Sequence, residues 1–250
     1  MLFISDLHLH EAIPRTVAAF EYFIRVTANT ADSVFILGDL FEYWIGDDML
    51  VSDPFAARMA GLMHTLSERG IALYIMHGNR DFLLGKRFMQ AAGAVWLPDP
   101  FVISVFGSRI ALSHGDALCT SDYKYQLFRR LSRSPAAQFF FLAWPFKWRC
   151  ALAQRLRQTK HGDRDRSDRA NRSNRSMSSY DVTSKGIQTL FASSNTATMI
   201  HGHTHKPACH QEPGGTRWVL PDWDLDCAAP RGGYLQIDAQ GIQAFSLEHP

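Results

Sequence analysis

The chain has 250 residues, of which 46% are hydrophobic and 20% charged, so it can bury one compact core and still carry an insertion. A formal net charge of +2 gives no argument for a nucleic-acid partner. No run reaches the about 18–20 apolar residues of a membrane span, so any membrane role would be peripheral.

We expect no secretory signal peptide, because Asp6 and His8 interrupt the first apolar run. The four cysteines show no paired spacing and are expected to be reduced thiols of a cytosolic protein. They are Cys119, Cys150, Cys209 and Cys227.

Short apolar runs alternate with helical patterns over the first 92 residues. The predicted strands cover 1–5, 33–37 and 71–76, and the predicted helices cover 14–28, 54–69 and 84–92. Pro14 and Pro54 suit the first turn of a helix, where an amide hydrogen is not needed. This alternation predicts βαβ units with a parallel central sheet.

The pattern then changes to strands joined by short turns. A short strand at 95–97 is followed by a hairpin, 101–106 with 109–113, that turns at Gly107-Ser108. The last part of the chain predicts strands at 197–200, 208–212, 216–220, 232–237 and 242–247. Two sheets with helices outside them are the expected architecture.

Residues 120–180 do not follow this rhythm and are interpreted as an inserted helical cap over the strand tips. Helical patterns cover 122–132, 135–158 (kinked or split by Pro145) and 180–191. The aromatic residues of 135–156 pack within the cap or line a groove for an apolar substrate, and the pattern alone favours packing. The basic residues of 155–175 form a solvated face or attract phosphates or an anionic membrane surface.

Five polar motifs each begin where an apolar, strand-like run ends. They are Asp6-Leu7-His8, Gly38-Asp39, Gly78-Asn79-Arg80-Asp81, His114-Gly115-Asp116 and His201-Gly202-His203-Thr204-His205. Ligands of α/β sheets bind beyond the carboxyl ends of the strands, so we expect these side chains to meet there. Asp, His and Asn side chains in that number predict a two-metal centre for phosphoester or phosphoanhydride hydrolysis.

The spacing suggests how the ligands are shared. Residues two apart on an extended chain point the same way, so Asp6 and His8 can reach one metal. Similarly, His203 and His205 can reach adjacent metals, and Asp39 can bridge the two. Asn79 adds a neutral oxygen and His114 a nitrogen. This mixed set is compatible with Mn, Fe, Zn or Co.

Each motif alone has a simpler interpretation. Asp-x-His is common, Gly-Asp and Gly-Asn-Arg are often turns, and a single His after a strand is usually a hydrogen-bonded surface group. Three histidines within 201–205 seldom serve packing, so this motif is the most informative one. The complete set in this order favours the metal centre.

The same set resembles the calcineurin-like metallophosphoesterase superfamily, over residues 6–205. The resemblance implies an α/β fold, a four-layer αββα sandwich core formed by 1–119 and 181–250, with the cap at 120–180 inserted. It implies that one metal is held by Asp6, His8, Asp39 and His205. The other would be held by Asp39, Asn79, His114 and His203.

Four longer segments resemble a narrower family, the UDP-2,3-diacylglucosamine diphosphatases of lipid A biosynthesis. They are 37–48, 77–88, 114–120 and 201–207. The resemblance implies attack of water on the α phosphorus of UDP-2,3-diacylglucosamine, giving UMP and lipid X, with two divalent metal ions, usually Mn²⁺. We also expect a monomer held peripherally at the cytoplasmic face of the inner membrane, with no nucleic-acid partner.

The narrower family also suggests substrate contacts. Arg80 would stabilise charge on the phosphoryl oxygens, although a surface salt bridge is the simpler interpretation. Asn79 and His203 would contact substrate as well as metal. Contacts to the sugar or its phosphate are expected from Asp122, Ser167, Asn171, and Asn174 or Arg175. Asn174 stands where the family has Lys, and Arg175 supplies a charge next to it, although a guanidinium fork does not act as a Lys point charge.

Asp81 and Asp116 are interpreted as partners that orient the histidine ligands. Three rival functions stay open from the sequence. Another metallophosphoesterase activity would not depend on acyl-chain length, and a binding scaffold with a degenerate site would tolerate loss of Asn79 or His114. A nuclease is the weakest rival, because no long basic groove is evident outside the cap.

Overall fold

A computed structural model describes residues 1–153, 155 and 181–247. It contains two sheets, with strand orders β11-β10-β1-β2-β3-β4 and β5-β6-β7-β9-β8. The strands of the first sheet are β1 (Leu2–Ile4), β2 (Ser33–Leu37), β3 (Ala72–Met76), β4 (Ala94–Leu97), β10 (Gly233–Asp238) and β11 (Gly241–Ser246). Those of the second are β5 (Phe101–Val105), β6 (Ser108–Ser113), β7 (Thr198–His201), β8 (Ala208–Glu212) and β9 (Gly215–Val219).

The predicted strands are all present, and their ends differ from the prediction by at most one residue. The helices are α1 (Pro14–Arg25), α2 (Met49–Ser52), α3 (Pro54–Glu68), α4 (Lys86–Ala92), α5 (Tyr123–Ser132), α6 (Pro135–Leu142) and α8 (Ser184–Ser194). Residues 146–153 are also helical, so the pattern predicted at 135–158 is split just before and at Pro145, as expected of proline. The short α2 was not predicted.

Alternation along the central strands explains the layers. In β1, Leu2 and Ile4 pack into the cluster formed with α1, α3 and α4, whereas Phe3 points into the cluster between the sheets. In the neighbouring β2, Phe35 also points between the sheets and stacks on Phe3 with ring centroids 4.7 Å apart. Because side chains of a strand alternate between faces, a wholly apolar strand requires cover on both faces.

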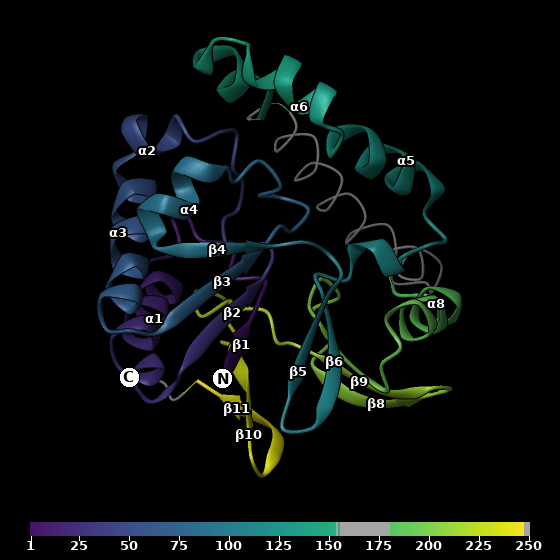
Figure 1. Cartoon of the computed structure of the whole chain (residues 1–250). Coiled ribbons are helices and arrows are strands. Elements are labelled where there is room, and N and C mark those ends of the chain that lie inside the picture. The colour runs from purple at the N-terminus through teal and green to yellow at the C-terminus, as the bar shows by residue number, and fades with distance from the viewer. Residues whose placement is uncertain (154, 156–180, 248–250) are drawn as a thin grey trace.

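The outer face of the second sheet is covered by α8. Ile187, Leu190 and Phe191 of this helix form a cluster with Ala111 of β6 and Met199 of β7. Figure 1 shows α1 and α3 beside the first sheet and α8 beside the second. The order helix, sheet, sheet, helix is the αββα sandwich that the sequence predicted, and this prediction is confirmed.

Helices α5 and α6 lie across the top of the molecule in Figure 1, away from the β10–β11 hairpin. Neither helix has a buried residue, and several large apolar side chains of 123–152 face solvent. They are Tyr123, Leu127, Phe128, Leu131, Phe139, Phe140, Leu142, Trp144, Trp148 and Leu152, which we call the exposed apolar set. No helix among the described residues is long and apolar enough to cross a membrane.

The same segment also contacts the sandwich. Phe141 and Phe146 pack against the cluster on the helical side of the first sheet. Arg149 is almost completely buried, donates to the carbonyl of Ile45 at 2.5 Å, and pairs with Asp48. Segment 123–153 therefore packs with one part and exposes another, and a groove for an apolar substrate stays a prediction.

Candidate metal centre

All five motifs lie at strand ends that converge. Strands β1, β2 and β3 are mutually parallel and end at Ile4, Leu37 and Met76, directly before the first three motifs. In the second sheet, β6 is parallel to β7, and they end at Ser113 and His201. The backbone amide of Gly202 donates to the carbonyl of His114 at 2.9 Å, and that of Asp6 donates to the carbonyl of Gly38 at 3.1 Å. Between the sheets, the backbone amide of His203 donates to Asp6 Oδ2 at 2.8 Å, so the tips of both sheets are joined in one site.

The backbone at these tips adopts an unusual conformation. Among the described residues, seven besides glycine have positive φ, and five of them are predicted ligands. These five are Asp6, His8, Asp39, His203 and His205, with φ between 49° and 69°. The left-handed region disfavours residues with a Cβ, and such residues cluster at functional sites.

This finding corrects one step of the sequence reasoning. Asp6 and His8 were expected to share a side because an extended chain alternates, but β1 ends at Ile4 and both residues are left-handed. Their side chains converge because the backbone turns sharply, with the amide of His8 donating to the carbonyl of Asp39 at 3.0 Å. The expected proximity is present, for a different reason.

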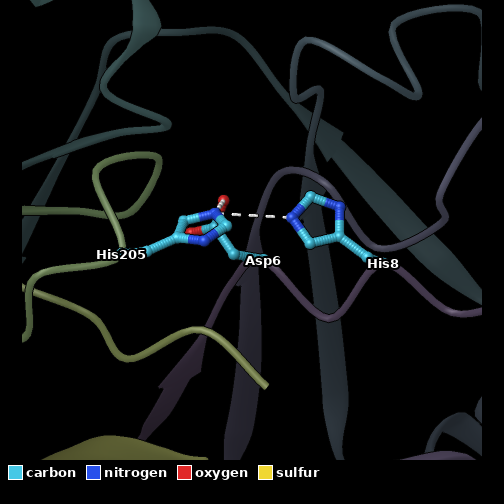
Figure 2. Close-up of side chains that lie close together, drawn as sticks. All are labelled: Asp6, His8 and His205. Atoms are coloured by element: carbon cyan, nitrogen blue, oxygen red, sulfur yellow. Dashed lines mark hydrogen bonds and ion pairs between the residues drawn. The ribbon is translucent and has the colours of Figure 1, made fainter. Parts of the chain in front are cut away.

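One group of possible ligands consists of Asp6, His8 and His205, shown in Figure 2. His205 Nε2 lies 3.4 Å from Asp6 Oδ1 and 3.4 Å from His8 Nε2. The ligand atoms of this group all lie within 4.8 Å of one another, from segments 197 residues apart in sequence. A single cation could contact all three.

A second group surrounds the side-chain oxygen of Asn79. That oxygen lies 3.0 Å from His114 Nε2 and 3.0 Å from His203 Nδ1. Asp39 is adjacent, with its Oδ1 3.9 Å from His114 Nε2 and its Oδ2 3.9 Å from His8 Nδ1. Asp39 therefore lies between the two groups, where a bridging carboxylate is expected. All seven predicted ligands are brought together.

The glycines of these motifs leave room for the carboxylates. A Cβ at Gly78 would overlap the Asp39 carboxylate, and one at Gly202 would overlap that of Asp6. The two carboxylates are thereby held directly against the backbone of neighbouring strand tips. Glycine is required here by close approach.

The donor set fits divalent cations. Among the described residues, Asp6 Oδ1 and His8 Nδ1 are buried without a hydrogen-bond partner, which costs free energy unless a ligand is bound. Asp, Asn and His side chains give the mixed oxygen and nitrogen donors that Mn, Fe, Zn and Co accept. The chemistry of the residues is therefore that of a two-metal centre.

Burial and mutual charge shift the pKa values of this group in opposite directions. Burial raises the pKa of Asp39 to about 7, with Asp81 and Asp6 adding to the rise. Burial lowers the pKa of His8 to about 3, helped by Arg80. Burial opposes the charged form of His205, yet its contacts with Asp222 and Asp6 raise the pKa to about 10.

Burial and neighbouring charges also oppose each other at Asp6 and His114, the completely buried acid and base of the site. Burial favours the neutral form of Asp6, but contact with His205 and the charge of His114 bring its pKa below its usual range. Burial also opposes protonation of His114, whereas Asp39, Asp6 and Asp116 raise its pKa to about 8. Protons thus occupy positions that cations would take.

Arg80 lies at the edge of this centre. Its backbone amide donates to Asp39 Oδ1 at 2.8 Å, and its guanidinium donates to Glu42 Oε1 at 2.5 Å. The side chain is about one third exposed, so it faces both the metal ligands and solvent. Glu42 lies in segment 37–48, which carried the narrower resemblance, but the sequence analysis assigned it no role.

Asp81 and Asp116 do not orient histidine ligands, which corrects their interpretation from sequence. Asp81 accepts from the amides of Leu40 and Gly78, both at 2.8 Å, and so joins two strand tips. Asp116 accepts from Tyr125, Arg129 and Arg133 of segment 123–153. Both are buried carboxylates that hold backbone segments in place.

Asp122, the predicted sugar contact, caps α5 by accepting from the amide of Tyr125 at 2.9 Å. Its role toward a substrate stays a prediction. The other predicted contacts lie outside the described residues; they are Ser167, Asn171, Asn174 and Arg175.

One carboxylate of the site was missed by the sequence analysis. Asp222 is buried and lies 3.2 Å from His205 Nδ1 through its Oδ2. It follows the predicted strand at 216–220 after a single proline. The rule that found the five motifs, a polar residue directly beyond an apolar strand, would have found it as well.

Comparison with known proteins agrees with this centre. The sequence model of the calcineurin-like phosphoesterases matches residues 1–207, and the chain belongs to this family of hydrolases. Among curated proteins, the UDP-2,3-diacylglucosamine hydrolase of Ralstonia nicotianae is 48% identical over 238 residues, covering 95% of this chain and 88% of that protein.

Two further relatives carry the same name. The hydrolase of Tolumonas auensis is 40% identical, covering 98% of this chain and 96% of its own length. That of Stenotrophomonas maltophilia strain R551-3 is 43% identical, covering 96% of this chain and 95% of its own length. The resemblances predicted from the motifs are thereby confirmed at both levels.

Proposed function

We propose that this protein hydrolyses UDP-2,3-diacylglucosamine to UMP and lipid X. The observation that carries the proposal is the convergence of seven metal-ligand side chains in a chain nearly half identical to a hydrolase of that name. Water attacks the α phosphorus, the bond from that phosphorus to the bridging oxygen breaks, and lipid X leaves with the bridging oxygen.

The proposed ligand sets are those of the sequence analysis. One position takes Asp6, His8 and His205, the other takes Asn79, His114 and His203, and Asp39 joins both. When bound, two divalent cations, which we propose to be Mn²⁺, supply an acidic water and neutralise phosphate charge. Left-handed backbone and close glycines hold the carboxylates in place before substrate arrives.

We assign Arg80 to the phosphoryl oxygens. In the present arrangement Glu42 Oε1 accepts from Arg80 at 2.5 Å, so a phosphate oxygen would replace or supplement that carboxylate. Partial exposure leaves the guanidinium accessible from solvent. Asn79 precedes Arg80 in the chain and lies 3.0 Å from His203 Nδ1 through its side-chain oxygen, and we propose that Asn79 and His203 contact the same phosphate.

Segment 120–180 is proposed as an inserted cap that receives the acyl chains. The support is the exposed apolar set, in which Phe139 is 71% and Trp148 67% exposed, because large apolar surfaces in contact with water usually bind an apolar ligand. Asp122 and the residues at 167–175 are proposed to contact the sugar and its phosphate. We propose a monomer that acts peripherally at the cytoplasmic face of the inner membrane.

The test is to incubate Mn²⁺-loaded protein with UDP-2,3-diacylglucosamine in detergent and oxygen-18 water. The expected products are UMP carrying the label and unlabelled lipid X, with no reaction in the presence of a chelator. Cleavage of a simple phosphodiester without turnover of the lipid substrate would contradict the substrate and favour another phosphoesterase activity. Label in lipid X would contradict attack on the α phosphorus.

A further inference from the structure

Asp222 occupies a position outside the five motifs but next to one of the proposed metal positions. It lies in the connection after β9, and its side chain is almost completely buried. Its Oδ2 accepts from Arg231 Nε at 2.9 Å and lies 2.8 Å from a terminal nitrogen of the same guanidinium. The same oxygen lies 3.2 Å from His205 Nδ1. A buried carboxylate is thus shared by an arginine and a metal-ligand histidine.

The surrounding backbone fixes this carboxylate beside the centre. The amide of Trp223 donates to the carbonyl of Asp6 at 3.1 Å, so the segment is joined to a proposed ligand. Asp224 and Arg231 form an antiparallel bridge with two backbone hydrogen bonds, at 2.9 and 3.0 Å. The loop between them is thereby closed, and it holds the guanidinium against Asp222.

This contact favours one nitrogen of His205 for metal binding. A carboxylate at Nδ1 favours a proton on that nitrogen, so a cation would displace the other ring proton and bind through Nε2. Nε2 is the nitrogen that lies 3.4 Å from both Asp6 Oδ1 and His8 Nε2, as Figure 2 shows for the three residues. The ring orientation, and the tautomer that the Asp222 contact favours, agree with one cation position.

The other histidine of this position has no such support. His8 Nδ1 is buried without a hydrogen-bond partner among the described residues, and its nearest outer carboxylate oxygen, Glu42 Oε2, is 3.7 Å away. Glu42 instead accepts from Arg80 through its other oxygen. Of the two histidines, only His205 is fixed by a carboxylate, so loss of that contact should affect this position more than the one at Asn79.

We propose that Asp222 is a positioning residue that fixes the ring and tautomer of His205 for metal binding, and that Arg231 fixes Asp222. The proposal rests on the proposed two-metal centre, and it goes beyond the family ligands to a residue of the 222–231 loop. Loss of a carboxylate that orients a metal-ligand histidine typically weakens metal binding about 10- to 100-fold.

The test measures Mn²⁺ affinity by calorimetry and by electron paramagnetic resonance, with no substrate present. In Asp222→Asn we expect one of two Mn²⁺ sites, the one that includes His205, to lose about 10- to 100-fold in affinity, with the other site unchanged. Asp224→Asn is the matched control, because Asp224 lies in the same loop and 3.4 Å from Arg231 but has no contact with His205. It should bind Mn²⁺ as the wild type does.

Activity then gives a second readout. The Mn²⁺ concentration for half-maximal rate should rise by a similar factor in Asp222→Asn, with most of the rate recovered at saturating Mn²⁺. Unchanged affinity at both sites in a folded Asp222→Asn protein would overturn the proposal. If that variant does not fold, Arg231→Gln is measured instead, and we expect a smaller loss at the same site; an unchanged affinity there would also overturn the proposal.

Failure of the proposed function gives a different result. A wild type that binds two Mn²⁺ ions but does not hydrolyse the lipid substrate would contradict the substrate, and the affinity shift of Asp222→Asn would still decide the role of Asp222. A wild type that binds no Mn²⁺ would overturn the role of Asp222.

Discussion

The strand tips and segment 123–153 place side chains in opposite environments, and both are unfavourable for folding. At the tips, Asp6 and His114 are completely buried, whereas in the segment Phe139 and Trp148 are about two-thirds exposed. Burying charge and exposing large apolar surface both oppose stability unless a ligand compensates. The comparison teaches that residues in an environment unfavourable for folding alone, whether buried charges or exposed aromatic rings, mark places where a ligand is to be looked for.

The largest effect is expected from loss of a buried ligand. His114→Ala should reduce turnover at saturating Mn²⁺ by more than about 100-fold, because loss of an outer partner of a ligand already costs about 10- to 100-fold and His114 is a proposed ligand itself. The measurement is the initial rate together with bound metal per chain. Full activity with a normal metal content would remove His114 from the centre.

Arg80→Ala should lower kcat by about 100- to 1000-fold with metal content unchanged, because charge stabilisation at the phosphoryl group is lost. Arg87→Ala is the matched control, since Arg87 is an exposed arginine of α4 seven residues away. Equal rates for both variants would show that Arg80 forms only a surface salt bridge and does not act on the phosphoryl group.

Removing a buried ring and removing an exposed ring should have different effects on the free energy of unfolding. Phe88 is completely buried against Phe41 and Trp44, so Phe88→Ala should lower the free energy of unfolding by about 3–5 kcal/mol. Phe140 is 68% exposed, so Phe140→Ala should change it by less than about 0.5 kcal/mol. Urea denaturation gives both values. The same Phe140→Ala variant should lose turnover mainly on long-chain substrates, and a large destabilisation would instead place Phe140 in a packed interface.

Metal binding should strengthen as the pH rises. Because the pKa of His205 is raised to about 10, the metal-free protein carries a proton there at neutral pH, and a cation must displace it. Apparent Mn²⁺ affinity at this position should therefore increase about tenfold per pH unit toward pH 10. Calorimetry in buffers of different ionisation enthalpy would detect the released proton.

The stability of the metal-free protein should change in the opposite sense. A pKa raised from 6.5 to about 10 stabilises the fold fully below pH 6.5, and this contribution is lost as the pH rises through about 10. Thermal unfolding of chelator-treated protein between pH 6.5 and 10 measures the loss. A flat profile would contradict the contact of His205 with Asp6 and Asp222.

The smallest effect concerns the thiols. None of the four cysteines, all of them among the described residues, forms a disulfide; Cys119 is buried, and burial, with Asp116 nearby, raises its pKa to about 12, whereas Cys209 is exposed. Cys209 should react with iodoacetamide at pH 8 within minutes, while Cys119 should react only after unfolding. Mass spectrometry of digested protein identifies the modified residue, and rapid labelling of Cys119 would show that this buried site opens.

The sequence alone determined the strands, the layers and the seven candidate ligands. Apolar runs of strand length specify a sheet covered on both faces, and polar residues directly after them must lie at the sheet edge, so both signals are local. The contacts of the 167–175 residues stay predictions, as do the roles of Asp122 and the cap boundaries.

Only the tertiary structure decided which charges meet. The pairs His205 with Asp222, Arg80 with Glu42 and Asp116 with Arg133 join different strand tips or loops, and no local pattern records their distances. The left-handed backbone of Asp6 and His8 is likewise imposed by neighbouring tips, because an isolated residue with a Cβ avoids that conformation. The local sequence determines which ligand side chains are present, and packing between distant segments determines the distances between them.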